Sequence, residues 1–193
     1  ISNKFKIEKK TVLIAPSWNV ENKSLLELHV DKILLELFNK NYKVILRPHP
    51  EHFKRSSEII KQIELKYKNN NLQVEKNINS LDSLFRAELL ITDWSGITFE
   101  FLFAFNKKVI SILTPPKIVN KNYKDIEIKL FEETVKELDN VLLLKEDQIK
   151  NIDYYIKNFE NEKLIEIKNK YKNLIYNYGK SGKFISSYMA NSD

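Results

Sequence analysis

The stretch Glu88-Leu-Leu-Ile-Thr-Asp-Trp-Ser-Gly-Ile-Thr-Phe-Glu100 decides the fold of this chain. It starts as a short apolar strand, passes through the polar turn Asp93-Trp94-Ser95-Gly96, and continues as a very hydrophobic helix. A helix that begins in such a turn has first N–H groups without intrahelical partners, and its dipole adds partial positive charge at the same point. The stretch therefore predicts a site suited to phosphate.

The flanking sequence alternates between strand and helix patterns. Continuous apolar runs are typical of strands buried on both faces of a parallel sheet. Most of the six segments that predict strands are of this kind: 11–15, 43–47, 72–75, 88–92, 108–113 and 141–144. Apolar residues at three- and four-residue spacing predict amphipathic helices at about 22–40 and 54–68, and a nearly all-apolar helix is expected at 95–106.

The remaining segments have weaker patterns. We expect short helical turns at 80–86 and 131–138, and a polar loop at 117–129. One or two lysine-rich helices are expected from about 146 to 178, closed by Gly179 and Gly182.

Strands that alternate with helices indicate an α/β fold, with a Rossmann-like, mainly parallel sheet and helices on both faces. One domain is expected for 193 residues. Ligands of such folds bind at the carboxyl ends of the strands. Three polar turns fall there: Ser17-Trp18-Asn19, Arg47-Pro48-His49-Pro50 and Asp93-Trp94-Ser95-Gly96. We expect these turns to share one ligand site.

His49 is the candidate catalytic residue. Prolines on both sides restrict its backbone, so its imidazole is held in place at little entropic cost on binding. It can donate to a phosphate oxygen or act as a general acid or base near neutral pH. The alternative is a rigid loop in which His49 only caps a carbonyl. Arg47 is expected to pair with a phosphate or with an internal carboxylate.

The turn before the apolar helix supplies further candidates. Ser95 offers a hydroxyl and an N–H, and Gly96 lets a ligand approach the backbone. Glu100 lies one turn further on, where its carboxylate can reach ribose hydroxyls. The alternative is a plain helix N-cap by Asp93 or Ser95. The candidate substrate-binding residues are Ser17, Arg47, Asp93, Ser95, Gly96 and Glu100.

Composition limits the function classes. The net charge of +6 favours anionic partners such as nucleotides, or it reflects compositional drift towards lysine. The chain has no cysteine, which excludes disulfides and thiolate metal sites. His49 and His52 lack a third ligand at zinc spacing, so neither a metal nor a cofactor is expected. His29 is expected on the surface of the 22–40 helix. With three glycines, the chain carries neither a P-loop nor a dinucleotide fingerprint.

Membrane and nucleic-acid signals are weak. No apolar run approaches the roughly 20 residues that a transmembrane helix needs, and no signal peptide is visible. The lysine-rich C-terminal helices could contact acidic lipids or nucleic acid, but their interleaved glutamates favour a solvated face. No nucleic-acid-binding motif is present, so nucleic acid is not an expected partner. Because the chain begins at Ile1, we expect a piece of a longer protein.

Three motifs give the chain a family resemblance. They are Val12-Leu-Ile-Ala-Pro16, Val44-Ile-Leu-Arg-Pro-His-Pro50, and Ser83-Leu-Phe-Arg-Ala-Glu-Leu-Leu-Ile-Thr-Asp-Trp-Ser-Gly96 with Phe99-Glu100 after it. In this order, over about 11–113, the chain resembles the C-terminal half of the CDP-glycerol glycerophosphotransferase family of teichoic-acid-type polymerases and primases. The resemblance implies one half of a GT-B fold, with His49 and Ser95 near the donor's pyrophosphate and Glu100 near its ribose.

The resemblance also implies a function in cell-surface polymer synthesis, of the teichoic-acid or capsule type. Glycerol phosphate would move from CDP-glycerol to the hydroxyl of a polymer or lipid-linked acceptor, and this chain would be the donor-binding half. The general base would belong to an N-terminal domain of the same protein, so the fragment would bind nucleotide without turnover. The expected location is cytoplasmic, with peripheral contact at the inner membrane face. The alternatives are another GT-B enzyme that uses a CMP- or UDP-sugar, such as a transferase or epimerase, and a non-catalytic nucleotide-binding module.

Overall fold

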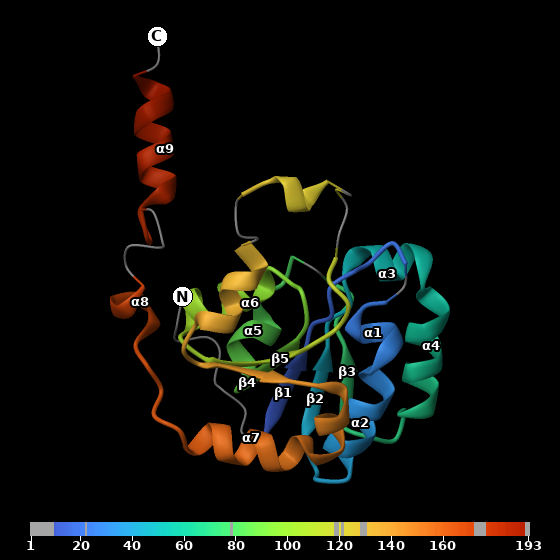
Figure 1. Ribbon diagram of the computed structural model, residues 1–193. Coiled ribbons are helices and arrows are strands. Elements are labelled where there is room, and N and C mark those ends of the chain that lie inside the picture. The colour runs from blue at the N-terminus through green and yellow to red at the C-terminus, as the bar shows by residue number, and fades with distance from the viewer. Residues whose placement is uncertain are drawn as a thin grey trace.

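The computed structural model describes residues 10–21, 23–77, 79–117, 120, 122–127, 131–171 and 177–191. Its centre is one sheet whose strand order is β3-β2-β1-β4-β5-β6 (Figure 1). Every neighbouring pair of strands is parallel. The strands are β1 (Thr11–Ile14), β2 (Lys43–Leu46), β3 (Leu72–Val74), β4 (Leu89–Thr92), β5 (Lys108–Ile112) and β6 (Val141–Leu144). The six predicted strands and the parallel α/β class are confirmed.

The strand order reverses between β1 and β4. From β1 the chain builds outward through β2 and β3, then returns to pair β4 with the other side of β1. In doubly wound sheets the crevice at this reversal, at the carboxyl ends of the strands, is where ligands bind. The topology therefore selects the turns that follow β1, β2 and β4.

Helices cover both faces of the sheet (Figure 1). One face carries α1 (Leu25–Leu28), α2 (Val30–Phe38), α3 (Pro50–Arg55), α4 (Ser57–Lys66), η3 (Glu146–Asn151) and α7 (Ile152–Asn161). The other face carries α5 (Asp82–Arg86), α6 (Ile97–Phe105) and η2 (Phe131–Glu137). The prediction of helices on both faces is confirmed.

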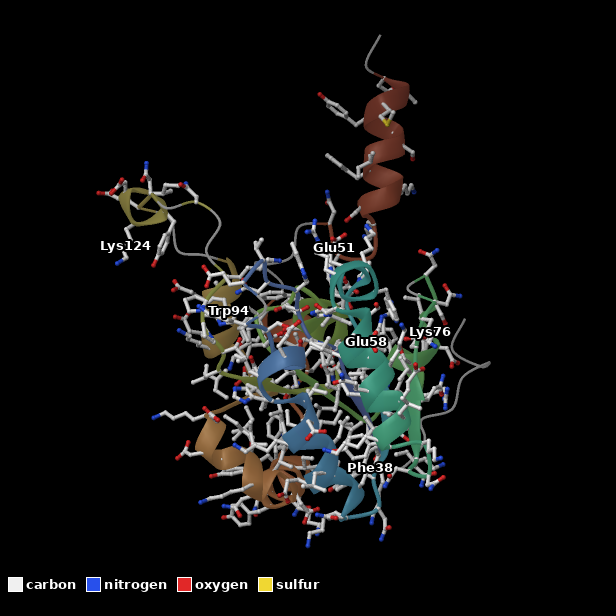
Figure 2. The ribbon with its side chains drawn as sticks, turned by 90° about the vertical axis from the view of Figure 1, so that its right-hand side faces the viewer. Phe38, Glu51, Glu58, Lys76, Trp94 and Lys124 are labelled. Atoms are coloured by element: carbon white, nitrogen blue, oxygen red, sulfur yellow. The ribbon has the colours of Figure 1, made fainter. Side chains whose placement is uncertain are left out.

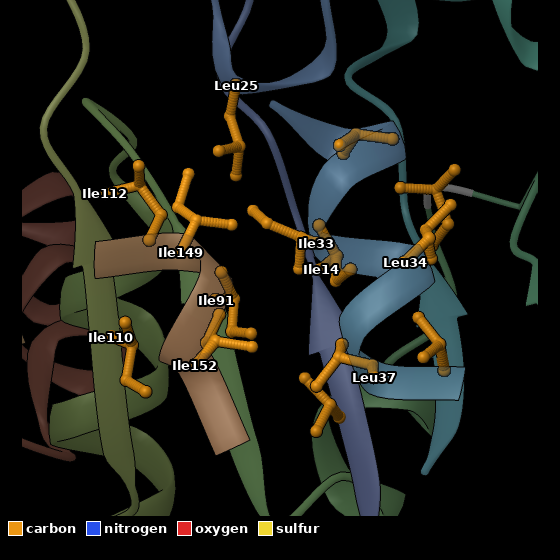
Figure 3. Close-up of a cluster of buried hydrophobic side chains, with 14 of the residues drawn as sticks. Ile14, Leu25, Ile33, Leu34, Leu37, Ile91, Ile110, Ile112, Ile149 and Ile152 are labelled. Atoms are coloured by element: carbon orange, nitrogen blue, oxygen red, sulfur yellow. The ribbon is translucent and has the colours of Figure 1, made fainter. Parts of the chain in front are cut away.

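Two apolar cores result from the alternation of side chains along each strand. In β1, Ile14 joins the core shown in Figure 3, whereas Leu13 joins the opposite core. Figure 3 shows Ile91 and Ile110 facing the helices on the face of the sheet that carries α2, η3 and α7. Burying one such side chain contributes about 1.5–3 kcal/mol, so the two cores hold the edge of the sheet, and its turns, in fixed positions.

Two predicted helices are divided. The helix expected at 22–40 breaks at His29, whose φ of −137° is not helical, and the second helix begins at Pro50 and breaks at Ser56, with φ −129°. The surface position expected for His29 is wrong, because the side chain is only 7% exposed. His29 lies three residues after Leu26 and four before Ile33, a spacing that places it on the apolar face.

The later part of the chain differs more from prediction. The segment expected at 131–138 is a 3-10 helix, η2, and a short η1 (Tyr123–Asp125) lies in the expected loop, of which residues 118–119, 121 and 128–130 lie outside the described residues. Helical structure over 146–178 comprises η3, α7 and α8 (Ile167–Lys170), and residues 172–176 are outside the described part. Gly182 does not end a helix. It lies inside α9 (Ser181–Ala190), which projects from the domain in Figure 1.

Among the described residues, no helix combines the length and the apolar character needed to cross a membrane.

Candidate functional site

Asp93 is the centre of the hydrogen bonds at the carboxyl edge of the sheet. Its carboxylate accepts from the Ser17 N–H at 2.7 Å, the Ser17 hydroxyl at 3.0 Å, the Leu25 N–H at 2.8 Å and the Thr114 hydroxyl at 3.5 Å. Burial raises the pKa of Asp93, and the hydrogen bonds from Ser17 and Leu25 act in the opposite direction. Asp93 thus ties the end of β4 to the end of β1, the start of α1 and the end of β5.

The start of α6 has backbone donors that no group in the described part of the chain accepts from. Neither Asp93 nor Ser95 caps the helix with its side chain, so the plain N-cap alternative does not describe this turn. The N–H groups of Gly96 and Ile97 donate to no other described residue, since the first helical bond runs from Thr98 to the Ser95 carbonyl. These two groups are available to an anion at the positive end of the helix.

Gly96 has no conformational need to be glycine. Its φ is −59°, which any residue adopts, and a Cβ at this position would meet no protein atom within 4 Å. The space in front of its backbone is open and belongs to the cleft described below. This agrees with the expectation that position 96 leaves room for a ligand to reach the backbone.

His49 caps the start of α3. Its Nδ1 accepts from the Glu51 N–H at 3.2 Å, so in the neutral ring the proton is assigned to Nε2. Burial, together with the charges of His52 and Lys117, lowers the pKa of His49. The expected alternative was a cap on a carbonyl, whereas the ring caps an N–H instead. It therefore remains neutral near pH 7 and presents an Nε2–H donor, for which no described residue supplies an acceptor.

Two adjoining cavities bring the predicted turns together. Both are lined by His49, Ser95 and Gly96. The glutamate lobe, as we name the larger cavity of about 380 Å³ after Glu100, adds Arg47, Glu100 and Ile97, with Ala15 and the prolines at 16, 48 and 50. The tryptophan lobe, about 200 Å³, adds Ser17, Trp18, Trp94 and Lys117. Figure 2 labels Trp94 and Glu51 at this edge of the molecule and Phe38 at the opposite edge.

Arg47 makes the internal contact that was one of its two expected alternatives. Its Nη1 donates to Glu75 at 3.1 Å, to the Ser80 carbonyl at 2.7 Å and to the Ser83 hydroxyl at 3.1 Å. The side chain is 14% exposed, and it braces the end of β2 against the end of β3 and the start of α5. A direct contact between Arg47 and a phosphate stays a prediction.

Ser17 and Glu100 occupy different environments. Ser17 is buried, and both its N–H and its hydroxyl are bonded to Asp93, so it positions the turn after β1. Glu100 is exposed on the first turn of α6 and lines the glutamate lobe, and its contact with a ribose stays a prediction.

A buried histidine lies below His49. His52 is fully buried, meets the His49 ring edge-on at 6.4 Å, and pairs with Glu27 at 3.3 Å between Nε2 and Oε1. Burial alone would raise the pKa of Glu27, but His52 and Ser24 lower it. The pair links α1 to α3 beneath the cleft. The described residues contain no group of three or more side chains arranged to hold a metal ion.

Trp18 and Trp94 lie in turns that were expected at the site, but neither was predicted as a ligand residue, and Lys117 was not predicted at all. Trp18 and Lys117 line the tryptophan lobe, with the Lys117 Nζ 5.9 Å from the Trp18 ring centroid. Lys117 follows β5, and the carboxyl-edge rule applied to that strand would have included it. Lys117 was not predicted as a site residue because the segment after Pro116 was interpreted only as a polar loop.

The chain is similar to known proteins both in sequence and in structure. The family model for CDP-Glycerol:Poly(glycerophosphate) glycerophosphotransferase matches residues 1–114. A teichoic acid glycerol-phosphate primase of Bacillus subtilis (strain 168) is 27% identical over 135 residues, which are 69% of this chain and 30% of that protein. The matched part of the chain therefore spans less than a third of this relative's length.

Solved structures support the fold. The UDP-GlcNAc 2-epimerase of Methanocaldococcus jannaschii matches with a TM-score of 0.56 and 21% identity, over 85% of this chain and 42% of that one. The same enzyme in complex with UDP-GlcNAc and UDP matches with a TM-score of 0.53 and 20% identity, over 80% and 39%. The Rossmann-like fold, of the kind that forms one half of a GT-B enzyme, is confirmed.

Proposed function

The chain belongs to the CDP-glycerol:poly(glycerophosphate) glycerophosphotransferase family, and on that premise we propose that it is the donor-binding half of such a transferase. The proposed donor is CDP-glycerol, and the proposed acceptor is the hydroxyl of a cell-surface polymer or of its lipid-linked precursor. The observation that carries this proposal is the set of donors around one cleft that lack a protein acceptor among the described residues. They are the N–H groups of Gly96 and Ile97 and the Nε2–H of His49.

These donors suit a diphosphate. The two N–H groups would bind phosphate oxygens at the positive end of α6, and the Ser95 hydroxyl lines the same space. His49, neutral because its pKa is lowered, would donate one directed hydrogen bond and would not abstract a proton. Glu100, in the glutamate lobe, would bind ribose hydroxyls.

The proposed reaction is an attack of the acceptor oxygen on the phosphorus that carries glycerol. The bond from that phosphorus to the bridging oxygen breaks, CMP leaves with the electron pair, and the acceptor proton passes to a base. The α6 N–H groups and His49 would stabilise the negative charge that develops on the leaving phosphate. We propose that the base and the second wall of the cleft come from an N-terminal domain, and that the enzyme acts at the inner face of the membrane.

Calorimetric titration of the protein with CDP, CMP, UDP and ADP tests the proposal. We expect cytidine nucleotides to bind most tightly, and binding to weaken in His49→Ala and Ser95→Ala. Ser187→Ala, on the exposed α9, is a matched control that should bind as the wild type does. A preference for UDP would indicate a sugar-nucleotide enzyme instead. Binding of none of the four nucleotides would contradict the proposed site.

A further inference from the structure

The tryptophan lobe contains a cation, Lys117, that no carboxylate of the described residues neutralises. Lys117 is exposed and lines this lobe with His49, Ser95 and Gly96. It forms no ion pair with any residue in the described part of the chain. Arg55, the other cation on the same indole, lies 5.4 Å from the Trp18 ring centroid and is bonded to Glu51 at 3.0 Å. Of these two cations, Lys117 is the one available to a ligand.

Trp18 orders this part of the cleft. Its ring is nearly parallel to the His49 ring, at 19° and 6.4 Å, and carries the Lys117 ammonium at 5.9 Å. Such a cation–π contact restricts the lysine without neutralising it. Trp18 thus holds a full positive charge close to the neutral His49 donor. The charge of Lys117 also contributes to the lowered pKa of His49, which agrees with this proximity.

The two lobes also give the cleft a direction. Glu100 lies on one side of the shared wall formed by His49, Ser95 and Gly96, and Lys117 lies on the other side. A phosphate chain that starts from a ribose near Glu100 and crosses the α6 terminus would reach Lys117 with its second phosphate.

We propose that Lys117, positioned by Trp18, binds the second phosphate of the donor and makes the site select nucleoside diphosphates over monophosphates. This inference rests on the proposed function and deepens it. The transferred group would then lie in the tryptophan lobe and the nucleoside in the glutamate lobe. Lys117 would reduce the negative charge of the phosphorus that the acceptor oxygen attacks.

The two tryptophans of the chain provide the measurement. Both Trp18 and Trp94 line the tryptophan lobe, and the sequence has no other tryptophan. Fluorescence titration of the protein therefore reports on this lobe, and calorimetry gives the Kd of each ligand. The ligands are CDP, CMP, UDP, ADP, inorganic pyrophosphate and inorganic phosphate.

We expect Lys117→Met to weaken CDP and pyrophosphate binding about tenfold, because one charge-assisted contact is lost, while the Kd for CMP changes less than about twofold. Lys117→Arg should retain most of the preference for CDP. Trp18→Leu should reduce the preference for CDP without weakening CMP binding, a result that loss of structure alone would not give. Lys124→Met is the matched control, since Lys124 is an exposed lysine of η1 away from the cleft (Figure 2), and it should match the wild type.

The inference and the proposed function can fail separately. If cytidine nucleotides are preferred but Lys117→Met leaves the ratio of CMP to CDP affinity unchanged, the role of Lys117 is wrong and the function stands. If CDP, UDP and ADP bind equally and Lys117→Met weakens all three but not CMP, the donor assignment is wrong and the role of Lys117 stands. Equal loss of CDP and CMP binding in Lys117→Met, or no binding of diphosphates by the wild type, overturns the inference.

Discussion

The two edges of the sheet both carry cavities with charged linings, but the lysines at the two edges differ in what they bind among the described residues. At the amino edge a cavity of about 420 Å³ is lined by Glu88, Lys107, Lys108, Glu160 and Glu162, among others. It is larger than either lobe at the carboxyl edge and is lined by more charged residues. Cavity size and charge would therefore favour the amino edge over the proposed site.

The difference lies in what the lysines bind. The Lys107 Nζ donates to the carbonyl oxygens of Leu84, Phe85 and Ala87 at 2.9, 2.8 and 2.7 Å, and burial lowers the pKa of this amine to about 8. Lys108 donates in the same way to carbonyl oxygens at the end of α7. These lysines close helix ends, whereas Lys117 and the Gly96 N–H have no protein acceptor among the described residues. Among the described residues, donors without a protein acceptor, more than charge itself, distinguish the proposed ligand site.

The largest effect is expected at Asp93. Asp93→Ala removes the acceptor of two buried backbone N–H groups and of the Ser17 hydroxyl, and each unsatisfied donor costs about 1–3 kcal/mol. We expect the free energy of unfolding to fall by about 3–5 kcal/mol in urea titrations. Asp125→Ala, at an exposed site in η1, is the control, and a similar small loss in both variants would contradict the role given to Asp93.

Lys107→Met tests the contrast between the edges directly. Three carbonyl oxygens lose their donor, so we expect unfolding to become easier by about 2 kcal/mol, with nucleotide affinity unchanged. Lys117→Met should do the reverse, with unchanged stability and weaker CDP binding. Chemical denaturation and calorimetry on both variants give the comparison. If Lys107→Met weakened CDP binding in its folded state, the amino edge could not be purely structural.

A smaller, pH-dependent effect on the free energy of unfolding is expected from His29. Burial lowers its pKa below the usual 6.5, with Lys32 acting in the same direction, while Glu146 and Asp93 oppose this. The unfolded state therefore binds more protons, and the stability contribution of the neutral ring is present above about pH 6.5 and lost as the pH falls. The Tm of the wild type should fall more between pH 7.5 and 5.5 than that of His29→Gln. Parallel falls would show that His29 does not titrate in this way.

Gly96→Ala should have only a small effect on stability. Its φ of −59° and the open space in front of its backbone allow a methyl group, so the free energy of unfolding should change by less than about 0.5 kcal/mol. CDP binding should still weaken severalfold, since the methyl group enters the space where phosphate approaches the backbone. Unchanged affinity, measured by calorimetry, would place the phosphate elsewhere.

Much of this edge was predictable from sequence. Apolar runs predicted six strands, and the rule for parallel sheets brought His49, Ser95 and Gly96 to one cleft, as observed. The partner of Arg47 was not predictable, because its bond to Glu75 depends on β3 lying beside β2, which strand patterns alone do not give. His29 was misplaced because its polarity was weighted above its spacing. Lys117 was missed because a charge in a loop has no periodicity, and only its place after β5 reveals it.

The bracing of the turns has a mechanical consequence. Asp93 joins the turns after β1, β4 and β5, whereas Arg47 joins the turn after β2 to β3 and α5. These two sets of turns contact each other at two points: the Glu27–His52 pair beneath the cleft and the Trp18–His49 ring contact at the rim of the cleft. The cleft thus lies between these two sets of turns, with Ser95 on one side and His49 on the other. A diphosphate that bonds to both Ser95 and His49 would link the two sets of turns. Amide hydrogen exchange in both sets should therefore slow together when the diphosphate binds.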